Sequence, residues 1–132
     1  MTVQLGAAQL ATAFLFGGSL LYSSTFAAFL FTALPPDQAG RLLRKAFSTY
    51  YLWVIATSLA GAVLYLGIDR LGSAALATIA ISTVPARQCL MPAINHAADR
   101  DDKRRFSLLH GLSVALGLAQ IFASGYVLLR AL

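Results

Sequence analysis

Four long apolar runs occupy most of this chain, and they constrain its fold more than any other feature. They cover residues 10–34, 51–68, 73–93 and 106–129. A helix needs about 20 predominantly apolar residues to cross the hydrocarbon core of a bilayer. Three of the four runs carry no ionisable group in their central part. The sequence therefore predicts an all-α fold, an integral membrane four-helix antiparallel bundle that forms a single domain over residues 1–132.

The connectors between the runs are short, so consecutive helices are expected to be antiparallel. Residues 35–47 alternate basic and apolar side chains at helical spacing, which predicts a short interfacial helix leading into the second span. Ser73 is the expected N-cap of the third helix, and Asp101 or Asp102 that of the fourth. The predicted helices cover residues of about 8–34, 49–68, 73–96 and 105–130.

The charged residues are few and basic on balance. They make up 11% of the chain, against about 25% in a soluble domain, and the formal charge is +5. The basic residues lie beside the predicted spans, where they set orientation, so nucleic acid is not an expected partner. The first and third connectors carry Arg41, Arg44, Lys45, Arg100, Lys103, Arg104 and Arg105, whereas the opposite side carries Arg70 and Arg130. This asymmetry predicts a multi-pass protein, in the inner membrane if bacterial, with both termini outside the cytoplasm.

Polar residues recur on one face of two predicted helices. The fourth helix carries His110, Ser113, Gly117, Gln120 and Ser124 at spacings that place them on one face. The first helix repeats the pattern with Gln9, Thr12, Phe16, Ser19 and Ser23. Such stripes either pack membrane helices together through interhelical hydrogen bonds or line a ligand site.

Arg87 is the one Lys or Arg inside the four apolar runs. An intramembrane arginine is costly unless it is paired or hydrated, and it marks a candidate functional site. Pro85 and Pro92 free the carbonyls of Ile81 and Gln88, which need donors that Arg87 could supply. The candidate binding pocket at this depth consists of Arg87, His110, Asn95, Tyr50, Ser113 and Gln120.

A metal site is an alternative use of the same region. The candidate metal ligands are His110, Met91 and Cys89, side chains of the kind that copper or haem uses. Cys89 and Met91 are two residues apart, so they cannot both face one ion on a regular helix. No cofactor is the primary expectation, with haem or copper as the alternative. The chain has no P-loop, no nucleophile elbow and no H-E-x-x-H sequence, so no enzymatic activity is predicted.

Three elements together resemble the transmembrane protein 205-like family, whose bacterial members form a membrane domain of unknown function. They are residues 106–113 (FSLLHGLS), the Arg87 to Pro92 element, and residues 47–51 (FSTYY). The resemblance extends from about Phe16 to the C-terminus and implies a four-helix membrane bundle with no established activity. Ser48 stands where the family often has proline. Ala8 and Gln9 stand where relatives often carry a histidine, which weakens a haem or copper site.

Three functions are compatible with these features. The first is a non-enzymatic accessory subunit or oligomeric interaction protein, in contact with the lipid bilayer and with copies of itself or other subunits. The second is transport or binding of a small molecule, anion or metal through the pocket around Arg87 and His110. The third is a haem- or copper-binding membrane protein.

Overall fold

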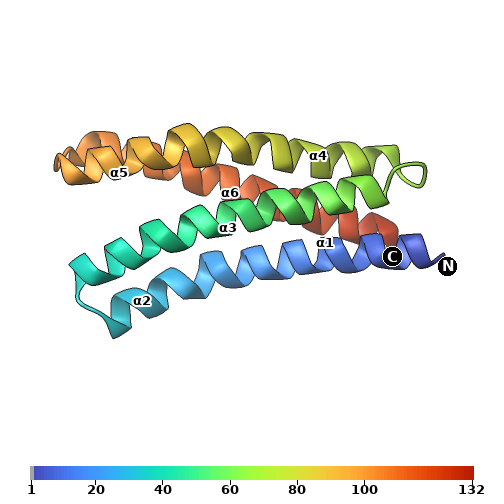
Figure 1. Ribbon diagram of the computed structural model, residues 1–132, viewed down its shortest axis with the longest axis horizontal. Coiled ribbons are helices and arrows are strands. Elements are labelled where there is room, and N and C mark those ends of the chain that lie inside the picture. The colour runs from blue at the N-terminus through green and yellow to red at the C-terminus, as the bar shows by residue number, and fades with distance from the viewer. Residues whose placement is uncertain (1) are drawn as a thin grey trace.

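The computed structural model describes residues 2–132, and it contains the four helical spans that the apolar runs predict. These are Val3–Ala33, Pro36–Leu64, Arg70–Asp99 and Lys103–Ala131, each long and apolar enough to cross a membrane. Consecutive spans run in opposite directions, and both termini lie at the same end of the molecule (Figure 1). The predicted all-α four-helix membrane bundle is therefore confirmed.

The first and third spans are each interrupted by one π-helical turn. The first consists of α1 (Val3–Leu21), η1 (Tyr22–Phe26) and α2 (Ala27–Ala33), and the third of α4 (Arg70–Pro85), η2 (Ala86–Leu90) and α5 (Met91–Asp99). The second and fourth spans are the single helices α3 (Pro36–Leu64) and α6 (Lys103–Ala131). η2 lies between Pro85 and Pro92, and Pro92 favours it, because proline lacks an N–H and its ring displaces the turn that precedes it.

The second span is longer than the sequence suggests. The predicted interfacial helix forms the start of this span, because residues 36–47 continue into it as one helix. Pro36 occupies the first turn, where its missing N–H is not needed, and Asp37 lies at the positive end of the helix dipole. The helix stops at Leu64, ahead of the predicted residue 68, and Gly67 adopts a φ of 81° in the following turn.

The N-cap of α4 differs from the prediction. Asp69, and not Ser73, caps this helix, and its carboxylate accepts from the N–H of Leu71. The hydroxyl of Ser73 instead donates to the carbonyl of Ala62 on α3, 2.8 Å away. At α6 the expected cap is present, since the Asp102 carboxylate accepts from the N–H of Arg105.

The four spans pack most tightly in the half of the bundle that carries the termini, here called the closed half. Its core contains Ala8, Leu15, Val54, Ala62, Tyr65, Leu76, Ile79 and Val127, which come from α1, α3, α4 and α6. Backbone carbonyls at the ends are also used: Gln4 donates to the Leu64 carbonyl and Gln9 to the Ala131 carbonyl. The closed half is thus held together by apolar contacts and by hydrogen bonds from α1 side chains to the C-terminal ends of α3 and α6.

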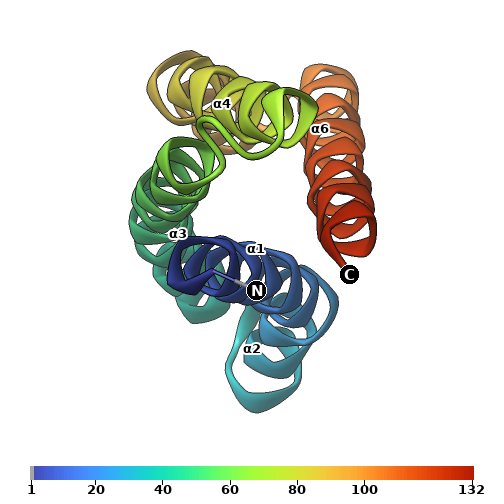
Figure 2. The same cartoon turned by 90° about the vertical axis from the view of Figure 1, so that its right-hand side faces the viewer.

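The other half, here called the splayed half, contains η1, α2, η2, α5 and the adjoining turns of α3 and α6. Here the first and fourth spans no longer pack together, because α2 diverges from the rest of the bundle (Figures 1 and 2). Only 17–28% of the most apolar stretch of each span is buried within the chain. The outward surface is therefore mostly apolar and suited to lipid.

Candidate functional site

Arg87 joins the third span to the second in the splayed half. It lies in η2, is partly buried, and donates through Nε to the Ser48 carbonyl (3.2 Å) and through a terminal nitrogen to the Ser48 hydroxyl (3.1 Å). The expected use of Arg87 on the local carbonyls of Ile81 or Gln88 is not what the structure shows. A guanidinium has five N–H groups, and these two bonds to neutral acceptors leave donors free for a further partner.

The α6 stripe is anchored at its deeper end. The Gln120 side chain donates to the hydroxyls of Ser82 and Thr83 on α4, both at 3.0 Å. Thr83 is fully buried and itself donates to the carbonyl of Ile79. Gln120 therefore ties α6 to the turn that precedes Pro85, one turn of helix from Arg87.

Two turns further toward the splayed half, α6 also reaches α3. The hydroxyls of Tyr51 and Ser113 lie 3.3 Å apart, and Tyr51 is 8% exposed. Beside Gly117, between Ser113 and Gln120, a Cβ atom would meet nothing within 4 Å. The stripe thus contacts two other spans, α4 through Gln120 and α3 through Ser113, and open space lies beside Gly117 between these contacts.

His110 heads the stripe, but it is not enclosed. It lies one turn before Ser113 on the same face, which is the face that bonds to Tyr51. Its side chain is exposed, and its ring stacks on Phe106 at 5.5 Å between centroids and 5° between planes. Within residues 2–132 it has no hydrogen-bond partner, and no bond links it to Arg87.

Tyr50 and Asn95 have different neighbours. Tyr50 packs parallel to Tyr22 at 4.2 Å between ring centroids, and its hydroxyl lies beside those of Ser19 and Ser23. It therefore belongs to the contact between the first two spans. Asn95 is partly buried in α5, which packs against α6, and no hydrogen bond of its side chain is found in the described chain.

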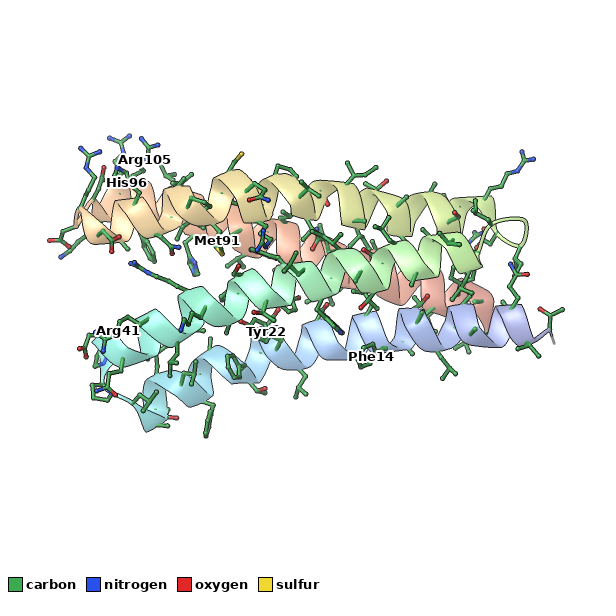
Figure 3. All side chains as sticks on the ribbon, in the orientation of Figure 1. Phe14, Tyr22, Arg41, Met91, His96 and Arg105 are labelled. Carbon is green, nitrogen blue, oxygen red and sulfur yellow. The ribbon has the colours of Figure 1, made fainter. Side chains whose placement is uncertain are left out.

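The candidate metal ligands are spread over the splayed half. Cys89 is exposed, Met91 is partly buried, and the π-turn between residues 86 and 90 means that the helix there is not regular. His96 lies at the end of the bundle near the α5–α6 connector, as does Arg105 (Figure 3), and its ring contacts Arg100. Residues 2–132 contain no cluster of three or more His, Cys, Asp or Glu side chains suited to a metal.

The sequence reasoning missed the acceptor groups of this site. Ser48, Tyr51, Ser82 and Thr83 make the bonds that hold Arg87, Ser113 and Gln120. The spacing of Arg44 and Ser48 was one available signal, because both lie on one face of α3, and Arg44 also reaches the third span through Asp99 (2.7 Å). Chemically, the arrangement offers a cation with free donors and several hydroxyls between the spans, with the exposed imidazole of His110 nearby on α6.

Comparison with known families gives one match, over residues 10–103. It covers more than two thirds of the chain and includes Tyr50, Arg87 and Asn95, whereas most of α6 lies outside it. Comparisons with curated proteins and with solved structures find no match. The chain belongs to the family described as domain of unknown function DUF4149, a small multi-helix membrane protein.

Proposed function

We propose that this protein is a non-enzymatic interaction protein of the membrane, either a subunit of a larger assembly or a homo-oligomer. The observation that carries the proposal is the exposure of the polar side chain of His110, which has no hydrogen-bond partner in the described chain. It lies seven residues, or roughly 10 Å, beyond the first residue of α6. A polar side chain at that depth is costly against lipid tails. A partner helix packed against the first turns of α6 beside His110 would cover it.

The test is site-specific photocrosslinking in native membranes. A photoreactive residue at position 110 is expected to give one discrete protein adduct, either a dimer of this chain or a product with one other subunit. The matched control is position 108, because Leu108 is 67% exposed and lies on the opposite side of α6. Lipid adducts alone at both positions would overturn the proposal.

A second candidate function is anion binding, and one observation favours it. Arg87 meets only neutral acceptors in the described chain, so its charge is not neutralised. Inorganic phosphate added to purified protein is then expected to raise the unfolding temperature by mass action. Arg87→Leu should abolish the increase, whereas Arg104→Leu, at an exposed position on α6, should retain it. Equal responses in both variants would contradict anion binding at Arg87.

The orientation of the protein in the membrane and its narrower family are also part of what we propose. The seven basic residues of the first and third connectors all fall at one end of the bundle, and the termini fall at the other (Figure 1). This supports a cytoplasmic splayed half and an inner-membrane location in a bacterium. The resemblance to transmembrane protein 205-like proteins is the narrower kinship that we propose within the DUF4149 family.

A further inference from the structure

A groove lies between the first two spans, on the outer surface of the splayed half. Its volume is about 670 Å³, within the range of small-molecule sites, and it is open along its length. The first span contributes Gly18, Tyr22, Phe26 and Leu30, and α3 contributes Leu42, Lys45, Ala46, Thr49, Tyr50 and Trp53. The groove exists because α2 diverges from α3 (Figure 1).

The inner end of the groove is shaped by aromatic packing. The Trp53 ring lies against Gly18 so closely that a Cβ atom there would clash with it. Tyr22 stacks on Tyr50 and on Phe26, with ring centroids 4.2 Å and 5.0 Å apart. These contacts give the groove a firm apolar floor.

Tyr22 and Phe26 also separate the groove from a second hollow. This hollow, of about 530 Å³, is lined by Gly18, Leu21, Tyr22, Thr25, Phe26 and Phe29. Both ridge residues belong to η1, the π-turn of the first span. The first span therefore presents two neighbouring apolar hollows with an aromatic ridge between them.

The mouth of the groove is basic. Lys45 lines it, and Arg41 lies one turn nearer the α2–α3 connector on the same helix (Figure 3). Within residues 2–132 Lys45 takes part in no ion pair, in contrast to its neighbour Arg44, which binds Asp99. Lys45 lies eight residues, or roughly 12 Å, from Trp53 along α3, so the charge and the deep apolar floor are well separated.

We infer that this surface binds one anionic phospholipid. The phosphate lies at Lys45, where a long cationic side chain reaches the membrane surface while its stem covers apolar groups. One acyl chain occupies the groove, and the other lies in the second hollow, across the ridge formed by Tyr22 and Phe26. A diacyl lipid matches both the two hollows and the positive mouth, which a purely apolar partner helix does not.

The test is native mass spectrometry of the purified protein in mild detergent. The probes are phosphatidylglycerol and phosphatidylcholine with identical acyl chains. The wild type is expected to retain one phosphatidylglycerol in preference to phosphatidylcholine. Lys45→Gln should reduce that preference about fivefold, the contribution of one basic residue near an anionic surface. Thr49→Trp, which fills the groove from an exposed position, should reduce retention of both lipids.

Two matched variants decide the outcome. Lys103→Gln removes a charge at the same end of the bundle, and Leu59→Trp adds a ring to an exposed position of α3 outside the groove. Both should behave as wild type. Equal retention of the two lipids by wild type, or equal losses in Lys45→Gln and Lys103→Gln, would overturn the inference. A dimer that Thr49→Trp dissociates would assign the groove to a second copy and would also overturn it.

Discussion

At the scale of single residues, the contact between Arg87 and Ser48 is the most informative. Arg87→Leu removes two hydrogen bonds to α3 and leaves the Ser48 hydroxyl without its donor. We expect it to lower the free energy of unfolding in detergent by about 1–3 kcal/mol. Ser48→Ala removes only the hydroxyl and should cost about 0.6 kcal/mol, as for a typical bond between membrane helices. Thermal unfolding of the purified variants provides the measurement.

The double variant shows whether the two residues act together. If they do, the loss in Arg87→Leu combined with Ser48→Ala is smaller than the sum of the single losses, by about 0.5 kcal/mol or more. Arg104→Leu, an exposed position on α6, is the control and should leave stability unchanged. Additive losses, or an Arg87→Leu protein as stable as wild type, would show that the contact does not hold α3 and η2 together.

At the scale of elements, Asp69 links the start of α4 to the end of α6. Its carboxylate accepts from the Leu71 N–H and from Arg130, 3.2 Å away. The Gly72 N–H, followed by Arg130 and Leu71, holds the pKa of Asp69 below its ordinary value of 3.8. A lowered pKa in the folded state stabilises the protein above pH 3.8, and this contribution is lost as the pH falls through the lower folded-state pKa.

Two substitutions separate the cap from the charge. Asp69→Ala removes both and should cost about 0.5–2 kcal/mol at neutral pH, as for other lost N-caps. Asp69→Asn keeps a capping oxygen, so it should cost less and should flatten the decline in stability below pH 3.8. Unfolding curves measured between neutral pH and pH 3 provide the test. If the stability of Asp69→Asn declined below pH 3.8 as steeply as that of wild type, the acid sensitivity would belong to another group.

The elements also show how far the sequence could be interpreted. The apolar runs predict the four spans because only helices satisfy backbone groups in lipid. They do not predict η1, because no proline lies near it in the sequence. In the structure, the hydroxyls of Ser24 and Thr25 donate to the carbonyls of Leu20 and Leu21 within this stretch. Periodicity likewise places His110, Ser113 and Gln120 on one face but cannot identify the acceptors on α3 and α4. Those depend on interhelical packing, to which a single sequence gives little access.

At the scale of the whole molecule, the bundle is asymmetric along its axis. Most of the large buried side chains lie in the closed half, whereas Arg87, His110 and the outer groove all lie in the splayed half. The basic residues follow the same division, because the two connectors of the splayed half are flanked by seven of them. Stability and candidate interactions are therefore concentrated at opposite ends, and the orientation in the membrane decides which compartment the splayed half faces.

The charge asymmetry predicts that the splayed half faces the cytoplasm and the termini face the other side. Cysteine labelling tests this after the single native thiol is removed by Cys89→Ser. In that background, Thr2→Cys should react with a membrane-impermeant maleimide in intact cells. Arg104→Cys, in the first turn of α6 at the opposite end, should react only after the membrane is opened. Labelling of Arg104→Cys in intact cells, with Thr2→Cys protected, would reverse the orientation and place the basic mouth of the lipid groove in the outer leaflet.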